Sequence, residues 1–483
     1  MNDNAFVEIQ NIFEKQRENR WKIAQTTSKE RIQKLKKLRD AIVERQDDFY
    51  KAVWQDFHKP QFEAWLSEIF PAIEEIDYTI SHLKNWMNDK RASKVFFLPM
   101  TKSRLRYEPK GQVLVFSPWN YPFLLLVNPI ISAIAAGNVI IAKPSHKTPH
   151  VSAFLAKLFS DTFPENEIAI IEGNGSEIGD KLLALPFDHI FFTGSPKIGA
   201  HIAEMAAKNH ASITLELGGK SPAILLPDVN IKRIIKQIAW GKTLNAGQTC
   251  IAPDYALCPQ DKVQEFASAF AEEIKRMFGD TEAKRYDNND FVHIIDKHAT
   301  ERHAALIKDA IAKGAKQVIG GISDIENCYT PITALIDVTP DMEIMKSEIF
   351  GPILPIVTYK TLDEAVQFVQ SRPKPLALYI FGTNKQDIDS VLCRTTSGST
   401  CINNTIVQIE NLEVPFGGVG MSGTGNYHGF YGFKTFSHER NIMEQKGFDM
   451  VQFFHPPYEI VDGSLRSKIQ KFAEKALRFF KSM

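Results

Sequence analysis

The sequence predicts an α/β protein with two regions in which strands alternate with helices. Short apolar runs separated by segments of helical pattern occur between residues 111 and 217 and again between 316 and 382. Buried parallel strands form such continuous apolar runs, and their alternation with helices indicates parallel sheets. The chain has 483 residues, 44% of them hydrophobic. That length and composition suffice for two or three packed regions.

The N-terminal part precedes the first of these regions. Residues 8–57 and 61–90 carry charged positions at helical spacing, with Ile, Leu, Phe and Trp between them. This pattern predicts two or three amphipathic helices.

The first alternation predicts a Rossmann-like nucleotide-binding unit over 111–217. Its expected strands are 112–117, 138–143, 168–171, 189–194 and 212–217. A further apolar run, 222–227, follows them. The stretch FTGSPKIGA at 192–200 follows one strand and opens a helical segment. Pro196 suits a first helical turn, and free N–H groups at a helix start suit a pyrophosphate. Gly194 and Gly199 would permit close approach, although a plain strand-to-helix turn is the alternative.

The second alternation predicts a second α/β domain. Its expected strands are 316–321, 332–338, 353–359 and 376–382, and its expected helices are 261–279, 298–313 and 361–371. Residues 104–111 are typical of an exposed strand. Residues 412–430 contain too much glycine for a regular element and are interpreted as a functional or connecting loop.

The composition argues against several classes of protein. Lysine plus arginine equals aspartate plus glutamate at 57 each, which gives no support for nucleic-acid binding. The five cysteines form no C-x-x-C pair, so we expect no metal site and a reducing cytoplasm. The charged N-terminus lacks a signal-peptide core, and no apolar run is long enough to span a membrane.

The stretch GKTLNAGQTCIAP at 241–253 raises the question of whether Cys250 is a nucleophile or an inert buried thiol. Most lone cysteines are inert. Three polar residues near strand or turn ends favour a cleft, however: Asn120, Ser195 and Glu216. Ligands of doubly wound sheets gather at the carboxyl ends of strands. Glu348 and Phe350 precede a turn and strand in the second domain.

Each of these residues has a simpler explanation. Asn120 could only stabilise its turn, and a lysine such as Lys143 at a strand end usually reaches solvent. Glu216 could be a surface carboxylate, but between Leu215 and Leu217 in an apolar strand it would be costly without a partner or role.

Seven motifs in order resemble the aldehyde dehydrogenase superfamily: PWNYP, KPS, FTGS, LELGGKSP, GQTC, EIFGP and PFGGVGMSG. The match extends from about residue 5 to 450. GQTCIAPDYALC and GNYHGFYGFKTFSHER are most similar to the class 3 branch, the fatty and aromatic aldehyde dehydrogenases.

The resemblance implies a fold with a cofactor domain, a catalytic domain and a small β oligomerisation arm. The NAD(P)-binding domain would comprise 1–90 and 111–217, and the catalytic domain 218–412. Bridging segments at 91–110 and 425–448 would support a homodimer.

The resemblance also implies a mechanism. Cys250 would attack the aldehyde and form a thioester, and Glu216 would activate the hydrolytic water. The Asn120 amide and the Cys250 N–H would stabilise the oxyanion.

The cofactor would be NAD or NADP, held by Trp119, Lys143, Gly194, Ser195, Gly199, Glu348 and Phe350. Lys143 would bind the adenosine ribose, Glu348 the nicotinamide ribose, and Phe350 would pack beside the nicotinamide. Where the family usually has a glutamate after KPS, this chain has His146. A histidine does not repel a 2′-phosphate, so we hypothesise that the enzyme accepts NADP as well as NAD.

The C-terminal segment 460–483 is predicted to be amphipathic. Its residues 464–483 contain six Lys or Arg and one Glu, and one helical stripe is apolar: Leu465, Ile469, Phe472, Ala476, Phe480 and Met483. The pattern suits peripheral contact with an anionic membrane at the cytoplasmic face. Packing on the protein body or on a second subunit is the alternative.

Two other functions stay open at this point. One is a cofactor-free thiol hydrolase of esters that uses Cys250 and Glu216, which would not need the unit at 111–217. The other is a non-catalytic membrane-binding protein, which would not need an intact cysteine and glutamate. The leading hypothesis is oxidation of a medium- or long-chain aliphatic, or an aromatic, aldehyde to its acid.

Overall fold

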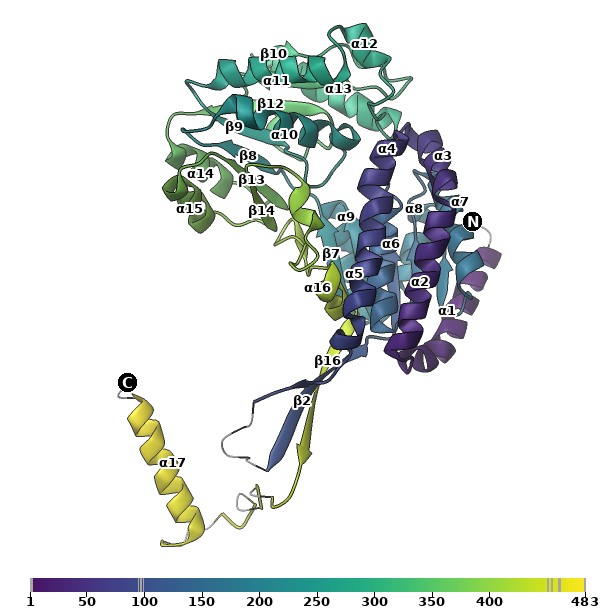
Figure 1. Cartoon of the computed structure of the whole chain (residues 1–483), viewed down its shortest axis with the longest axis vertical. Coiled ribbons are helices and arrows are strands. Elements are labelled where there is room, and N and C mark those ends of the chain that lie inside the picture. Colours follow the sequence, from purple (N-terminus) through teal and green to yellow (C-terminus); the bar gives the residue numbers. More distant parts are fainter. Residues whose placement is uncertain are drawn as a thin grey trace. The chain divides into compact units, whose positions relative to one another are not determined.

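The computed structural model describes residues 3–93, 95, 98, 100–449, 451–452, 455–458 and 462–481. The chain divides into two compact units, of which the larger comprises Met1–Trp86 and Glu108–His438. This unit contains two largely parallel sheets with helices on both faces (Figure 1). The predicted α/β class is confirmed.

The first sheet of the larger unit has six strands in the order β15-β7-β6-β3-β4-β5. The five strands β3 to β7 are parallel, and every residue of β3 and β4 is buried. Their bounds agree closely with the predicted runs: β3 Gln112–Phe116, β4 Val139–Lys143, β5 Ile168–Ile170, β6 His189–Gly194 and β7 Ser212–Leu217.

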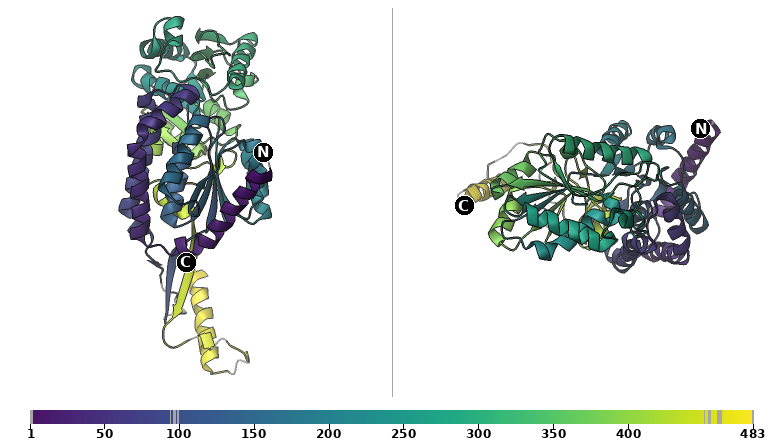
Figure 2. Two further views of the ribbon diagram at one scale, coloured as in Figure 1. Left: turned by 90° about the vertical axis from the view of Figure 1, so that its right-hand side faces the viewer. Right: turned by 90° about the horizontal axis from the view of Figure 1, so that it is seen from above.

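Helices cover both faces of this sheet. One face packs against α1, α8 and α9, and the other against α6, behind which lie α2 and α5 (Figure 2). The helices of this part are α1 Asp3–Ala24, α2 Ser28–Glu44, α3 Gln46–Phe57, α4 Gln61–Ala64, α5 Phe70–Trp86, α6 Leu124–Ala136, α7 Pro149–Thr162, α8 Gly175–Leu183 and α9 Pro196–Lys208. A π-helical turn, Trp65–Ile69, joins α4 to α5.

The second sheet has seven strands in the order β10-β11-β12-β9-β8-β13-β14, with only β10 antiparallel to its neighbour. The strands are β8 Pro222–Leu225, β9 Tyr255–Pro259, β10 Lys316–Ile319, β11 Thr333–Ile336, β12 Ile353–Tyr359, β13 Ala377–Phe381 and β14 Ser399–Ile402. The sequence pattern predicted neither β9, which begins five residues after Cys250, nor β14.

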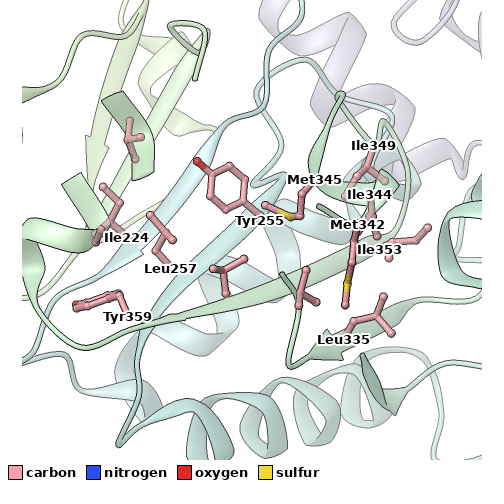
Figure 3. Packing of buried hydrophobic residues seen from close by; sticks show 14 of the residues in the cluster. Ile224, Tyr255, Leu257, Leu335, Met342, Ile344, Met345, Ile349, Ile353 and Tyr359 are labelled. Carbon is pink, nitrogen blue, oxygen red and sulfur yellow. The ribbon is translucent and has the colours of Figure 1, made fainter. Parts of the chain in front are cut away.

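Buried side chains from these strands pack against helices of the same region (Figure 3). Ile224, Leu257 and Ile353 lie in one core cluster. The cluster also contains Leu306 of one helix and Val366 of another. The helices are α10 Ile231–Thr243, α11 Val263–Phe278, α12 Glu282–Tyr286, α13 Lys297–Ala312, α14 Leu362–Gln370 and α15 Lys385–Arg394. This core anchors β9 and β12, the strands that follow the segments carrying Cys250 and Glu348.

The prediction that 412–430 contains no regular element was wrong in part. Two of its residues form β15, Gly423–Thr424, which pairs antiparallel with β7 and places Gly423 opposite Glu216. Gly423 has φ 147°, and a Cβ there would collide with the Leu215 carbonyl. Glycine therefore allows this strand instead of preventing it. The segment also runs into α16, Gly429–Thr435.

The smaller unit comprises Met87–Tyr107 and Glu439–Met483. Its sheet has the order β1-β2-β16, with β1 Lys90–Arg91 antiparallel to β2 Thr101–Pro109, the strand predicted at 104–111. β16 is Ser437–Gln445, and the predicted C-terminal helix is α17, Leu465–Lys481. Among the described ranges, no helix is both long and apolar enough to cross a membrane.

Candidate active site

The loop that carries Cys250 is held in an uncommon backbone conformation. After α10 ends, Asn245 and Ala246 both adopt left-handed φ values, 54° and 51°. Such values are costly for residues other than glycine and persist only when the surroundings fix them. The Asn245 amide donates to the backbone oxygens of Asn120, at 2.9 Å, and Gln248, at 3.1 Å. The Gln248 amide donates to the His293 carbonyl at 3.0 Å. The position of Cys250 is therefore set by several long-range hydrogen bonds.

Cys250 is partly exposed and lines a cavity of about 380 Å³ in the larger unit. Burial raises the pKa of its thiol to about 12, and the neighbouring carboxyl groups of Glu348 and Glu216 add to the shift. The thiol is therefore protonated at neutral pH in this structure. A nucleophilic role requires that a base or a change of environment remove the proton.

Glu216 lines the same cavity and is 3% exposed. Neither carboxyl oxygen has a hydrogen-bond partner among the described residues. Burial alone raises its pKa well above the usual range. A buried carboxyl group without a partner is expensive, and groups with such shifts gather at functional sites. The structure thus places two of the predicted residues, Cys250 and Glu216, at one cavity.

The rest of the cavity wall is mostly apolar. Residues from α5 and α6, the end of α10 and the segment 406–428 contribute to it, including Phe70, Leu124, Leu125, Trp240, Leu244, Ile406, Leu412, Phe416 and Tyr427. The volume lies at the lower end of the range typical of small-molecule sites, about 300–1,000 Å³. The cavity can therefore bind a small or slender hydrophobic molecule beside the Cys250 thiol.

Asn120 follows β3, is buried, and contacts the loop that carries Cys250. Its amide nitrogen donates to the Gln248 carbonyl at 3.0 Å. The next residue, Tyr121, does line the cavity, and its hydroxyl is 2.5 Å from Thr249 Oγ1. One amide proton of Asn120 is thus used to hold the loop, which leaves a second for a ligand.

A buried ion pair that the sequence analysis missed supports Asn120. Lys59 and Glu68 are both 0% exposed, with Nζ 2.7 Å from Oε1. Lys59 also donates to the Asn120 carbonyl at 3.2 Å. The second Glu68 oxygen accepts from the N–H groups of Phe123 and Leu124, at 2.9 and 3.3 Å. Glu68 lies in the π-helical turn, an irregularity that often marks functional regions.

Four predicted cofactor residues lie at the carboxyl ends of β4 and β6. Lys143 ends β4 and is 5% exposed; burial lowers the pKa of its ammonium to about 8, and it donates to the Pro144 carbonyl at 3.0 Å. Ser195 is exposed and is the N-cap of α9, with no side-chain cap bond. Gly194 precedes it. His146 is exposed in the turn after β4, and desolvation followed by the charges of Lys143 and Lys147 lowers its pKa.

Gly199 has a packing role, and its predicted contact with the cofactor stays a prediction. It is buried inside α9, and a Cβ there would lie 2.7 Å from Leu217 Cδ2. Its lack of a side chain lets α9 pack closely on β7, which is the role of the last glycine in dinucleotide-binding turns.

Glu348, Phe350 and Trp119 lie together. Burial raises the pKa of Glu348 to about 8, with Asp254 adding to the shift. Its carboxylate fills the space where Gly218 would carry a Cβ. Phe350 has φ 52°, and its ring meets the Trp119 ring edge-on at 5.4 Å. Arg302 fixes this segment by donating to the Ile349 carbonyl at 2.7 Å.

The residues at this sheet edge fit a dinucleotide. Ser117 follows β3, and Thr193 is the last residue but one of β6. Ser117 Oγ and Thr193 Oγ1 are buried and have no hydrogen-bond partner in the described part of the chain. Ribose hydroxyls and phosphates can supply such partners, and Lys143 has donors left for them. The free N–H groups at the start of α9 suit a phosphate.

A second buried pair was also missed. His428, at the start of α16, lines the cavity and contacts Glu75 of α5. In the sequence, His428 lies beside an aromatic residue in a glycine-rich stretch, and that pattern does not identify Glu75 as its distant partner.

Comparison with known proteins adds the following. The model of the aldehyde dehydrogenase family matches residues 4–442. The 4,4′-diaponeurosporen-aldehyde dehydrogenase of Staphylococcus aureus is 41% identical over 430 residues, 89% of this chain and 92% of that protein. Mouse aldehyde dehydrogenase family 3 member A2 is 38% identical over 429 residues, 88% of this chain and 87% of that protein.

Solved structures share the fold. A substrate-bound Staphylococcus aureus AldH superposes with a TM-score of 0.90 at 38% identity, over 96% of this chain and 98% of that chain. A Mycobacterium tuberculosis aldehyde dehydrogenase with NAD+ gives 0.80 at 26% identity, over 88% and 87%. A Methanocaldococcus jannaschii glyceraldehyde-3-phosphate dehydrogenase with NADP gives 0.83 at 25% identity, over 91% and 95%.

Proposed function

The chain belongs to the aldehyde dehydrogenase family and is an NAD(P)-dependent enzyme, and from that premise we propose that it oxidises a hydrophobic aldehyde through a covalent adduct on Cys250. The observation that carries the proposal is the shared cavity of Cys250 and Glu216 between apolar walls. The substrates would be medium- or long-chain aliphatic aldehydes, or aromatic ones, because these bury the most apolar surface there.

In the first step the Cys250 sulfur bonds to the carbonyl carbon, and the thiol proton leaves to a base. The carbonyl oxygen becomes an oxyanion, for which the second amide proton of Asn120 and the Cys250 N–H are donors. A bound oxidised NAD(P) would supply the acceptor for the hydride of the adduct carbon. The product left on the enzyme is a thioester of Cys250.

Glu216 serves the hydrolytic step in this proposal. Among the described residues, neither of its oxygens has a hydrogen-bond partner, so either can accept a water proton. Burial raises its pKa well above the usual range, and hydration within the site would favour the charged carboxylate that acts as the base. The carboxylate then takes a proton from water as the water oxygen bonds to the thioester carbon. The C–S bond breaks and the acid is released, while the proton held by Glu216 passes to the sulfur, which restores the Cys250 thiol and the Glu216 carboxylate.

The cofactor would lie along the ends of β4 and β6. Lys143 would bind the adenosine ribose, and Ser195 with the start of α9 would bind the pyrophosphate. Glu348 would bind the nicotinamide ribose, while the Trp119–Phe350 pair would pack near the ring. His146 offers a hydrogen-bond donor and no negative charge, which supports use of NADP as well as NAD.

These placements support the predicted assignment of a function to each part of the chain. We propose that 1–90 with 111–217 binds the cofactor and that 218–412 supplies the nucleophile. The segments 91–110 and 425–448 would pair with a second copy, because β16 is the last strand in its sheet order and edge strands are suited to pairing.

The tail is proposed to contact anionic membrane surfaces. In α17, the Phe472 side chain is 62% exposed, and six basic residues occur between 464 and 483. Of the predicted stripe, the side chains of Leu465, Ala476 and Phe480, and all of Met483, lie outside the described residues. Co-sedimentation with anionic liposomes should be strong for the full chain and weak for residues 1–460; equal binding by both would rule out a role for the tail.

The main experiment is a panel of aldehydes from short to long, and aromatic ones, monitored by reduced-cofactor absorbance. We expect kcat/KM to rise with hydrophobic length and the Cys250→Ala variant to be inactive. Ester hydrolysis that needs no cofactor, without aldehyde oxidation, would instead support a thiol hydrolase.

A further inference from the structure

A buried histidine at the cavity has one ring nitrogen without a partner. His428 is 4% exposed, and its Nδ1 is 2.9 Å from Glu75 Oε2. The other Glu75 oxygen accepts from the Gly429 N–H at 2.8 Å. On the opposite side of the ring, Nε2 has no hydrogen-bond partner among the residues that the structure describes. The hydrolytic chemistry of Cys250 and Glu216 makes no use of this nitrogen.

The His428 ring is fixed in place. It stacks on the Tyr427 ring, with centroids 4.1 Å apart, and meets the Phe416 ring edge-on at 5.8 Å. All three residues line the cavity. His428 also has φ 75°, outside the common range for residues other than glycine. Glu75 and the aromatic rings thus hold one orientation of the imidazole.

This orientation determines what Nε2 can do. A carboxylate accepts hydrogen bonds, so the Nδ1 facing Glu75 carries the ring proton. In the neutral ring, Nε2 is then an acceptor. A buried acceptor is costly unless a donor reaches it, and the surrounding wall of aromatic and aliphatic side chains offers mainly apolar surface.

We infer that His428 Nε2 accepts a hydrogen bond from a hydroxyl group of the substrate, so that the enzyme selects hydrophobic aldehydes carrying an alcohol away from the carbonyl. The inference rests on the proposed function and narrows its substrate class. His428 starts α16 and Cys250 lies on the loop before β9, so the two residues would bind different parts of one substrate.

Two carboxyl groups could compete for this role. Glu74 and Glu410 line the same cavity. Burial raises the pKa of Glu410, a protonated His428 would lower it, and Glu74 raises it further. Glu410→Gln is therefore a matched control that removes a neighbouring carboxyl group and leaves the Glu75–His428 pair in place.

The test uses benzaldehydes with a methyl, hydroxymethyl or methoxymethyl group at the 3- or 4-position, and alkanals of increasing length with or without a terminal hydroxyl. These alcohols do not ionise at pH 8, so the hydroxyl group is a donor throughout the comparison. For at least one position or length, the wild type should show roughly three- to tenfold higher kcat/KM for the alcohol than for the methyl compound. The methoxymethyl compound, which has no donor, should gain nothing.

Variants then assign the preference to Nε2. In His428→Asn the ratio of alcohol to methyl kcat/KM should fall to near one, whereas Glu410→Gln should keep the wild-type ratio. Residue 428 has φ 75° and ψ 139°, outside the left-handed helical region, so the readout is the ratio of the two kcat/KM values and not the absolute rate of the variant. In Glu75→Gln the amide can donate to Nδ1, which moves the ring proton to Nε2, so the methoxymethyl compound should become as favoured as the alcohol.

Two results would overturn the inference: no alcohol preference in the wild type at any position or length, or a preference that persists in His428→Asn and is lost in Glu410→Gln. Both are distinct from failure of the proposed function, in which no aldehyde is oxidised in a Cys250-dependent way.

Discussion

Replacement of Lys59 by methionine should destabilise the protein strongly and weaken the support of Asn120. The ammonium is 0% exposed, lies 2.7 Å from Glu68 Oε1 and donates to the Asn120 carbonyl. It also lies 4.2 Å from the centre of the Tyr121 ring. Methionine fills similar space but leaves the Glu68 charge with only two backbone donors.

The expected loss is about 3–5 kcal/mol in unfolding free energy, the usual cost of leaving one member of a buried pair uncompensated. The double variant Lys59→Met/Glu68→Leu should recover much of that loss, because it removes the unpaired charge. The midpoints of denaturant unfolding for the three proteins measure both effects. A Lys59→Met protein within about 1 kcal/mol of wild type would refute the idea that this ion pair supports the site.

The effect should also depend on pH. Burial already raises the pKa of Glu68, and Lys59 opposes that shift. Without Lys59 the pKa of Glu68 in the folded variant rises further above its unfolded value. The variant therefore loses stability as pH rises from the unfolded pKa toward the folded pKa, and it regains stability at lower pH, where the carboxyl group is protonated. The gap between wild type and Lys59→Met should therefore narrow as pH falls.

Three further predictions concern the reacting groups and the cofactor. Since burial raises the pKa of the Cys250 thiol to about 12, its alkylation by iodoacetamide in the free enzyme should be slow at pH 7 and rise about tenfold per pH unit up to pH 10; a plateau near pH 8 would contradict the structure. In Glu216→Gln, steady-state turnover should fall by about 10²–10⁴ while the first equivalent of reduced cofactor still forms; an unchanged rate would exclude Glu216 as the base. Steady-state kinetics should show use of both cofactors, with His146→Glu shifting the enzyme toward NAD; a wild-type preference for NAD above a hundredfold would reject this.

The sequence predicted those parts of the fold that depend on local pattern. Continuous apolar runs identified β3 to β7 because buried parallel strands require them. The strand β9 was not predicted because its sequence, YALCP, is short and ends in proline. The segment 412–430 was misinterpreted because glycine can mark either a loop or a close strand contact, and only the position of Leu215 distinguishes them.

The roles of Cys250 and Glu216 could be predicted because motifs that resemble a known family surround them, whereas a lone cysteine is usually inert. The pairs Lys59–Glu68 and Glu75–His428 could not be predicted, because local sequence pattern does not show which side chains will pair. The second pair joins residues 353 positions apart and forms only in the folded chain. The left-handed conformations of Asn245 and Ala246 likewise depend on distant hydrogen bonds.

The most direct test of the central claim is the mass of the Cys250 peptide after acid quench of Glu216→Gln with NAD+ and a hydrophobic aldehyde. We predict that the acyl group of the substrate is found on Cys250, in an amount equal to the reduced cofactor formed. Reduced cofactor without acylation of Cys250, or acylation at another residue, would contradict the proposed mechanism.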